Sequence, residues 1–208
     1  MMRPFDDATR WNIAGACAAF ARLPHSDAPS ALKRAAVAIT LTAEGERDTS
    51  LLLTLRASHL RAHRGQWALP GGRCDAGETP VAAALRELDE ELGLKLAADA
   101  VLGLLDDYPT RSGYLITPVV IWAADGETIV PNPEEVASVH RIALDAIERE
   151  DAFDFVAIPE SARRVIRFHH EGNLIHAPTA ALIYQFREVL AGRATRVAEL
   201  EQPVFAWK

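Results

Sequence analysis

Residues 71–94 constrain the fold of this chain more than any other stretch, because they predict a glycine loop that leads into one well-defined helix. Thr79 suits the N-cap of that helix and Pro80 suits its first position. Gly93 stands where a left-handed residue commonly ends a helix. The apolar residues recur at helical spacing and predict one buried stripe, formed by Val81, Leu85, Leu88 and Leu92.

Three carboxylates of the same helix, Glu87, Glu90 and Glu91, stand at positions i, i+3 and i+4. This spacing predicts that they cluster on the face opposite the apolar stripe and repel one another. We expect a hard divalent cation to relieve the repulsion, because carboxylates, water and substrate phosphates are the usual ligands of magnesium and manganese. The alternative is a solvated acidic face, which is what most charge runs are. Taken alone, the carboxylates favour that alternative.

A longer pattern of fixed positions encloses these carboxylates. It starts at Gly72, reaches Glu78 after five residues and, after seven more, ends with the run Arg86-Glu87-Leu88-Asp89-Glu90-Glu91-Leu92-Gly93-Leu94. The pattern matches the Nudix box throughout, and chance rarely produces so many positions of mixed chemistry. The chain therefore resembles the Nudix hydrolases. The resemblance implies an α+β fold, an α/β/α sandwich with a mixed sheet between helices, and metal-dependent hydrolysis of a nucleoside diphosphate derivative.

The resemblance also assigns roles to individual residues. The expected metal ligands are three carboxylates and one backbone carbonyl, those of Glu87, Glu90, Glu91 and Gly71. The expected catalytic group is Glu87, Arg86 and Glu78, in which Arg86 orients Glu87 and Glu78 holds Arg86. Whether Glu87 is a metal ligand or the general base stays open. A carboxylate from a distant loop often completes such a site, and Glu134 and Glu135 are the candidates, although both are equally consistent with plain loop charges.

A basic loop, residues 57–66, precedes the glycine loop and follows Arg56 directly. It contains Arg61 and Arg64, and no acidic residue interrupts it. In a chain of net charge −7, a local cationic patch at this place suggests the capture of an anion. The alternative is ordinary solvated loop charge. Trp67 is close enough to the glycine loop to stack on a base.

The stretch before the box is similar to the signature of the coenzyme A diphosphatase branch of the family. It reads Leu52-Leu53-Thr54-Leu55-Arg56-Ala57, followed at three-residue intervals by Arg61, Gly65 and Leu69-Pro70-Gly71-Gly72. Residues 112–120 and 135–139 also resemble that branch. The resemblance implies coenzyme A or acyl-coenzyme A as the substrate, cleaved to 3′,5′-ADP and (acyl-)phosphopantetheine. Because coenzyme A carries a further phosphate, the expected substrate contacts are Arg56, Arg61 and Arg64.

Two other classes of function compete with this one. The first alternative, within the same family, is that the chain hydrolyses ADP-ribose, a dinucleotide or a nucleoside triphosphate. In a different class, the chain is a non-catalytic module that senses a nucleotide without hydrolysing it. Such a module is expected to lose box carboxylates, whereas this chain retains Glu78, Glu87, Glu90 and Glu91.

Composition limits the partners and the location. The net charge of −7 argues against binding to nucleic acid or an anionic membrane. No apolar run approaches the ~20 residues that span a bilayer. Only two cysteines occur, Cys17 and Cys74, so a disulfide framework is not expected and the reducing cytoplasm fits best. We expect a small nucleotide-type substrate as the partner, and the sequence leaves a homodimer open.

The hydrophobic pattern predicts a mixture of strands and helices. Residues 4–24 form an N-terminal helix that packs Ile13, Phe20 and Leu23 on the domain. With their linker they make a first region, 1–30, and the hydrolase domain occupies 31–208 with its box at 72–94. The expected strands are 35–42, 51–56, 101–105, 115–123 and 136–142, with a hairpin over 165–176. The expected further helices are 143–150 and 179–190.

Overall fold

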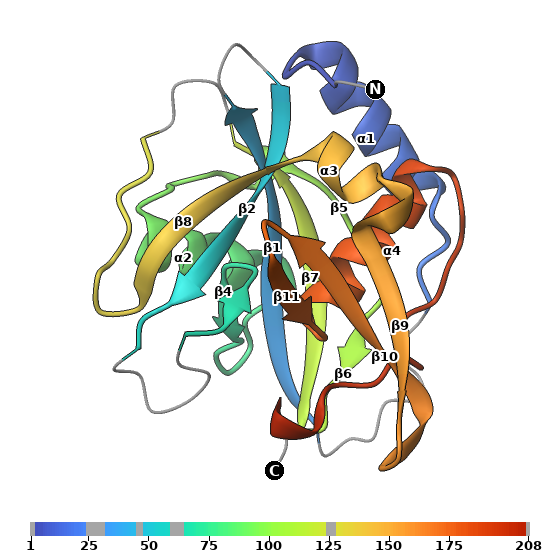
Figure 1. Cartoon of the computed structure of the whole chain (residues 1–208). Helices are drawn as coiled ribbons and strands as arrows, with labels where there is room; N and C mark the ends of the chain where they lie inside the picture. Colours follow the sequence, from blue (N-terminus) through green and yellow to red (C-terminus); the bar gives the residue numbers. More distant parts are fainter. Residues whose placement is uncertain (1–2, 24–31, 45–47, 59–64, 124–127, 207–208) are drawn as a thin grey trace.

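The computed structural model describes residues 3–23, 32–44, 48–58, 65–123 and 128–206 (Figure 1). They form a large mixed sheet, a smaller antiparallel sheet and four α-helices. Three short 3₁₀ helices occupy Ala98–Ala100, Glu150–Ala152 and Val204–Ala206. Within the described part of the chain, no helix has the length and apolar character needed to cross a membrane.

The large sheet is built around β1 (Lys33–Glu44). One side of β1 pairs in parallel with β7 (Tyr114–Trp122), and the other pairs antiparallel with β2 (Asp48–Arg56) and β4 (Gly71–Arg73). β1 and β2 confirm the strands predicted over 35–42 and 51–56. The remaining strands of this sheet are β3 (Trp67–Ala68), β5 (Val101–Leu104), β6 (Tyr108–Pro109) and β8 (Val136–Ala143).

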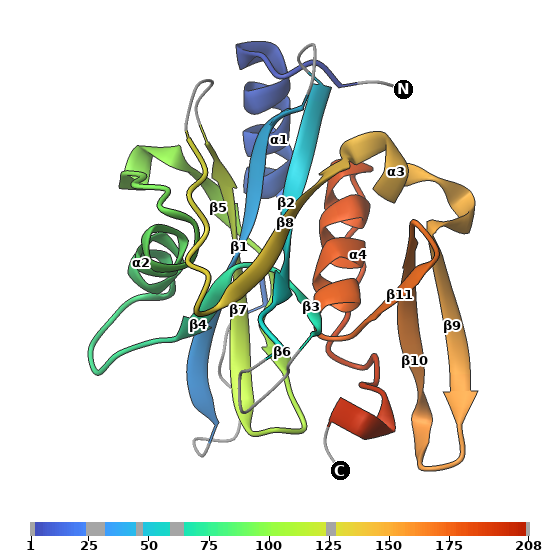
Figure 2. The ribbon, with the colours of Figure 1, turned by 60° about the vertical axis from the view of Figure 1, so that its left-hand side comes forward.

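Helices cover both faces of the large sheet (Figure 2). Helix α2 (Pro80–Leu92) lies on one face, while α1 (Asp7–Ala19) and α4 (Thr179–Leu190) lie on the other, with α3 (Leu144–Glu148) following β8. This arrangement confirms the predicted sandwich of a mixed sheet between helices. The strands pack on both faces because successive side chains point to opposite sides.

The alternation of β1 shows how the two cores are separated. Ala36 and Ala38 pack in the core beneath α2, whereas Ile39 and Leu41 pack in the core beneath α1 and α4. In β7, the residues that pack beneath α2 are Val119 and Ile121, and those on the opposite face are Val120 and Trp122. Strands buried on both faces therefore hold the box helix on one side of the sheet.

The smaller sheet lies beside α4 and has the order β11–β10–β9. Its hairpin of β10 (Ser161–His170) and β11 (Asn173–His176) confirms the predicted one, and Glu171 and Gly172 at its turn adopt positive φ. Strand β9 (Phe153–Ile158) was not predicted. It pairs antiparallel with β10, the next strand along the chain, and the Phe153 and Phe168 rings stack on each other.

The N-terminal helix is shorter than predicted. It begins after Asp6, whose side chain accepts a hydrogen bond from the Thr9 N–H (2.8 Å), and it ends at Ala19. Ile13 and Phe20 are buried as expected, but Leu23 is 54% exposed, so that part of the prediction is wrong. Because the helix stops before Leu23, this residue no longer lies on the apolar stripe.

Candidate metal and substrate site

Helix α2 begins and ends at the residues that its sequence predicts. The Thr79 side chain accepts a hydrogen bond from the Ala82 N–H (3.2 Å), and Pro80 occupies the first position. Gly93 adopts φ 68° and its N–H donates to the Asp89 carbonyl (2.9 Å). Leu88 is fully buried against the sheet, which fixes the direction in which the remaining faces of the helix point.

The glycine loop before α2 approaches two other parts of the site closely. Gly71 has φ 151°, and a Cβ added there lies 2.3 Å from the Ala36 carbonyl oxygen of β1. A Cβ added at Gly72 lies 2.2 Å from Oε1 of Glu87. Only glycine therefore fits at these two positions without a rearrangement. The loop backbone is in direct contact with the box carboxylates.

Arg86 lies among three of the box glutamates. Its Nε and Nη2 each donate to one oxygen of Glu78, at 3.0 Å in both cases. Its Nη1 donates to Glu87 and to Glu90, both at 2.9 Å. The hydrogen bonds to Arg86 lower the pKa of Glu78. Arg86 thus relieves part of the repulsion that we expected a metal ion to relieve.

Glu91 lies deeper than the sequence predicts. It is 2% exposed, so it is not part of an outward acidic face. The Gly71 N–H donates to its Oε2 (3.2 Å), and Nη1 of Arg56 lies 3.6 Å from its Oε1. Burial raises the pKa of Glu91 to about 7, despite the opposing effects of Arg56 and Gly71. Burial also raises the pKa of the neighbouring Glu87.

The structure distinguishes between the two distant carboxylates. Glu135 lies near the cluster, since its charge raises the pKa of both Glu87 and Glu91. The backbone explains this position, because the Glu135 carbonyl accepts a hydrogen bond from Ala57 (2.9 Å), at the end of β2. Glu134 is exposed, and its N–H donates to the Asn132 side chain (3.1 Å).

The chemistry of the donor set fits a hard divalent cation. Glu87, Glu90, Glu91 and Glu135 offer carboxylate oxygens, and one of them is a buried carboxylate whose ionised form is poorly compensated. In the part of the chain that the structure describes, however, no group of three His, Cys, Asp or Glu side chains is arranged to hold a metal ion. Arg86 holds Glu87 and Glu90 instead, so a cation bound there would have to compete with Arg86 for these carboxylates.

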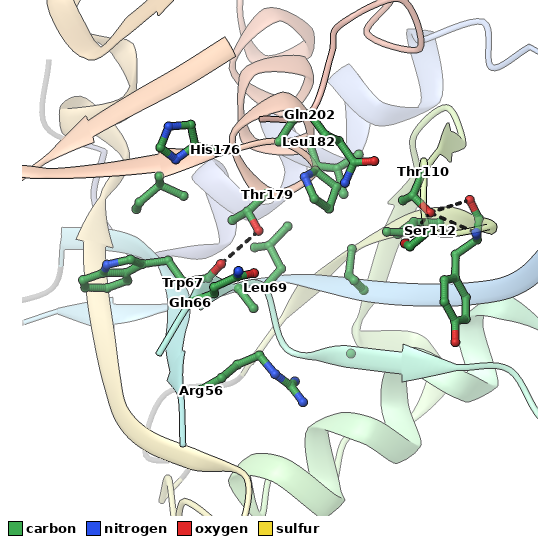
Figure 3. A pocket seen from close by; sticks show the side chains of 18 of the residues that line it. Arg56, Gln66, Trp67, Leu69, Thr110, Ser112, His176, Thr179, Leu182 and Gln202 are labelled. Atoms are coloured by element: carbon green, nitrogen blue, oxygen red, sulfur yellow. Dashed lines mark hydrogen bonds between the residues drawn. The ribbon is translucent and has the colours of Figure 1, made fainter. Parts of the chain in front are cut away.

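A cavity of about 550 Å³ adjoins the cluster (Figure 3). Arg56, Gly71 and Gly72 line the end nearest the carboxylates. Trp67 also lines it, and the Thr179 hydroxyl donates to the Trp67 carbonyl (3.2 Å). The Trp67 ring packs 4.4 Å from the His140 ring, centroid to centroid. The cavity therefore joins an aromatic surface to the charged site.

The predicted substrate contacts fall into two groups. Arg56 lies in the cavity beside Glu91, where it can meet an anionic ligand. Arg61 and Arg64 lie outside the residues that the structure describes.

The far wall of the cavity comes from the C-terminal region, and the sequence did not predict it. Its lining residues are Leu174, Ile175, His176, Ala177, Pro178, Thr179, Leu182, Gln202, Pro203 and Phe205. The one signal in the sequence is the apolar character of the tail, residues 201–207, which predicts that the tail docks on the domain. Pro203 is indeed buried, although Phe205 is largely exposed.

Comparison with known proteins identifies the family. The model of the NUDIX domain matches residues 32–160. An uncharacterized Nudix hydrolase, NudL, from Yersinia enterocolitica is 37% identical over 139 residues, which cover 65% of this chain and 71% of that protein. Nudix hydrolase 3 of Caenorhabditis elegans is 40% identical over 126 residues, which cover 59% of this chain and 51% of that protein.

Among solved structures, the Nudix hydrolase RenU from M. smegmatis is 28% identical and has a TM-score of 0.43, with 55% of this chain and 72% of that chain covered. The family model spans more than half of the chain, and the relatives agree with it. The chain therefore belongs to the Nudix family, as a hydrolase that acts on phosphorus anhydrides of nucleotide derivatives.

Proposed function

We propose that this hydrolase cleaves the diphosphate of coenzyme A or acyl-coenzyme A with Mg²⁺ or Mn²⁺, and that its products are 3′,5′-ADP and (acyl-)phosphopantetheine. The observation that carries the proposal is the cavity, which joins the carboxylate cluster and Arg56 at one end to an apolar wall at the other. A substrate with a diphosphate and a long uncharged arm matches this arrangement. The similarity of residues 52–72 to the coenzyme A diphosphatase signature supports the same substrate.

Hydrolysis adds one water molecule across the P–O–P bridge and leaves two phosphomonoesters. A divalent cation, once bound by these carboxylates, would neutralise the phosphate oxygens and acidify the attacking water. Arg56 attracts the phosphates to the edge of the cluster, and Arg86 fixes the orientation of Glu87. The raised pKa of Glu87 makes its carboxylate a better proton acceptor, and the carboxylate equally suits metal ligation.

The proposed ligands are the carboxylates of Glu87, Glu90 and Glu91 and the Gly71 carbonyl. Glu135 is the distant carboxylate that we propose to complete the set, because of the two candidates it is the one that acts on Glu87 and Glu91. The non-catalytic alternative is disfavoured by the retention of every box glutamate. The proposed location is the cytoplasm, which keeps free thiols such as Cys17 and Cys74 reduced.

A substrate panel tests the proposal. The purified chain is incubated with Mg²⁺ or Mn²⁺ and, separately, with coenzyme A, ADP-ribose, a diadenosine polyphosphate and a nucleoside triphosphate. Products are identified by chromatography and mass spectrometry. We expect 3′,5′-ADP and phosphopantetheine from coenzyme A at the highest kcat/KM of the panel. Cleavage of ADP-ribose with coenzyme A left intact would overturn the assignment.

A further inference from the structure

The two ends of the cavity differ in chemistry. Arg56 lies on the side of the box helix, whereas His176, Leu182 and Gln202 lie across the cavity from it (Figure 3). The far end is lined mainly by carbon-rich side chains of β11, α4 and the tail. Such a surface binds an uncharged chain better than it binds phosphates.

The rim of the far end exposes apolar side chains. Leu174 is 44% exposed and Phe205 is 61% exposed, and both line this cavity. The Phe205 ring packs edge-to-face on the His176 ring, with a centroid distance of 5.3 Å. Exposed apolar side chains that line the same opening are typical of a ligand-binding groove.

The tail that carries Phe205 is fixed to both sheets by Glu201. Arg111, from the turn before β7, donates to Glu201 through Nε (3.0 Å) and Nη2 (2.5 Å). The Ser161 hydroxyl of β10 donates to it as well (2.7 Å), and the Glu201 N–H donates to the Arg164 carbonyl (2.8 Å). These hydrogen bonds hold the tail in place as one wall of the cavity.

The fixation continues on either side of Glu201. The Arg111 N–H donates to the Gln202 side chain (2.6 Å), and the Tyr108 hydroxyl donates to the Leu200 carbonyl (2.8 Å). These bonds bring the chain next to Phe205 up against the turn that precedes β7. The position of Phe205 at the rim therefore follows from polar contacts made by its neighbours.

We propose that the tail, residues 201–206, determines the selectivity for the uncharged arm of the substrate. Phe205 contacts the acyl chain of an acyl-coenzyme A, and Glu201 is a positioning residue that holds the tail against the cavity. This inference rests on the proposed function. It assigns the choice of substrate to a segment beyond residues 32–160, which match the family model.

The test is a chain-length profile. The kcat and KM of the whole chain are measured with coenzyme A, butanoyl-coenzyme A and dodecanoyl-coenzyme A, for the wild type and for Phe205→Ala. We expect the ratio of kcat/KM for the dodecanoyl substrate to that for coenzyme A to fall about tenfold in Phe205→Ala, mainly through KM. Glu201→Gln should shift the ratio in the same direction. Trp11→Ala, which removes another exposed aromatic side chain, is the matched control and should leave the ratio unchanged.

Two results overturn the inference. An unchanged ratio in Phe205→Ala shows that the tail does not contact the acyl chain, and an equal loss on all three substrates places Phe205 at the nucleotide instead. The proposed function fails in a different way. A wild type that leaves coenzyme A intact while it cleaves ADP-ribose refutes both proposals, whereas cleavage of coenzyme A with a wild-type profile in Phe205→Ala refutes the inference alone. Circular dichroism of each variant confirms the fold.

Discussion

Two glutamates lie behind opposite walls of the cavity, Glu91 beside the lining residue Gly71 and Glu201 beside the lining residue Gln202. They are equally buried, each 2% exposed, yet the protein treats their charges differently. Glu201 accepts two hydrogen bonds from Arg111, one from Ser161 and one from the Gln202 N–H. These hydrogen bonds lower its pKa to about 2. Glu91 receives one backbone hydrogen bond and has an arginine 3.6 Å away, and burial raises its pKa to about 7.

The comparison shows that the protein compensates the buried charge of Glu201 fully but compensates the buried charge of Glu91 only in part. A buried carboxylate is tolerated when hydrogen bonds and an opposite charge compensate it. The protein meets that need at Glu201, so this residue serves to fix the tail. At Glu91 the compensation is incomplete, which fits a residue whose partner is a cation from solution. We therefore propose that the charged wall, at Arg56 and the carboxylate cluster, carries the reaction, and that the apolar wall, at α4 and the tail, selects the substrate.

The largest effect should come from the charged wall. Glu90→Gln removes a proposed metal ligand, and we expect kcat to fall at least about 10³-fold, or about 4 kcal/mol. Asp89→Asn is the matched control, because Asp89 is the preceding residue of the helix and lies outside the hydrogen bonds of Arg86. Steady-state kinetics and circular dichroism compare the two variants. If Glu90→Gln retains activity, the site has been misassigned.

At the apolar wall, the next largest effect is expected on the free energy of unfolding. Glu201→Gln weakens the pairing with Arg111, and we expect the free energy of unfolding to fall by about 3 kcal/mol at pH 7. Because folding lowers the pKa of Glu201 from 4.5, its contribution is complete above about pH 4.5 and is lost as the pH falls towards 2. Denaturant unfolding at pH 7 and pH 3 measures the difference. An equal difference at both pH values would contradict this account of Glu201.

A smaller effect on kcat is expected when the Glu87 carboxylate is displaced but keeps its charge. Gly72→Ala adds a Cβ 2.2 Å from Oε1 of Glu87, so the carboxylate must move, and we expect kcat to fall about 10- to 100-fold. Gly15→Ala, in the exposed middle of α1 with no atom within 4 Å, is the control and should leave kcat unchanged. Wild-type kcat in Gly72→Ala would show that the position of Glu87 is not critical.

The smallest effect concerns the metal-free protein. Folding raises the pKa of Glu91 from 4.5 to about 7, so its contribution to stability is complete below pH 4.5 and is lost as the pH rises through 7. In Glu91→Gln a neutral amide replaces the ionisable carboxyl, so the variant does not lose stability in this way as the pH rises. We expect the variant to be about 1–2 kcal/mol more stable than the wild type at pH 8 in EDTA, and to lose that advantage at pH 4. Unfolding curves at both pH values measure it, and a less stable variant at pH 8 would contradict the pKa shift.

Much of the fold could be predicted because its signals are local. Thr79, Pro80 and Gly93 mark both ends of α2, and the period of its apolar residues sets its buried face. Helix α4 matches its predicted bounds, 179–190, for the same reason. Strand β9 escaped prediction because it has no clear alternation of buried and exposed residues after Phe153, and because its pairing with β10 is irregular between Ser161 and Val165.

The site shows the same division. The pairing of Arg86 with Glu78 could be predicted from the box pattern, since both residues lie near the start of one helix. The burial of Glu91 could not, because it depends on Arg56 and on the packing of α2 against the sheet. The position of the tail could not be predicted either, since it depends on the pairing of Glu201 with Arg111, which lies 90 residues away in the chain.

Binding of Mn²⁺ tests the central claim most directly. Titration calorimetry at pH 7.5, without substrate, compares the wild type with Glu91→Gln and Glu201→Gln. We predict that Glu91→Gln weakens Mn²⁺ binding at least about tenfold, whereas Glu201→Gln binds the ion as the wild type does. Wild-type affinity in Glu91→Gln, or an equal loss in both variants, would contradict the claim that the charged wall alone holds the metal.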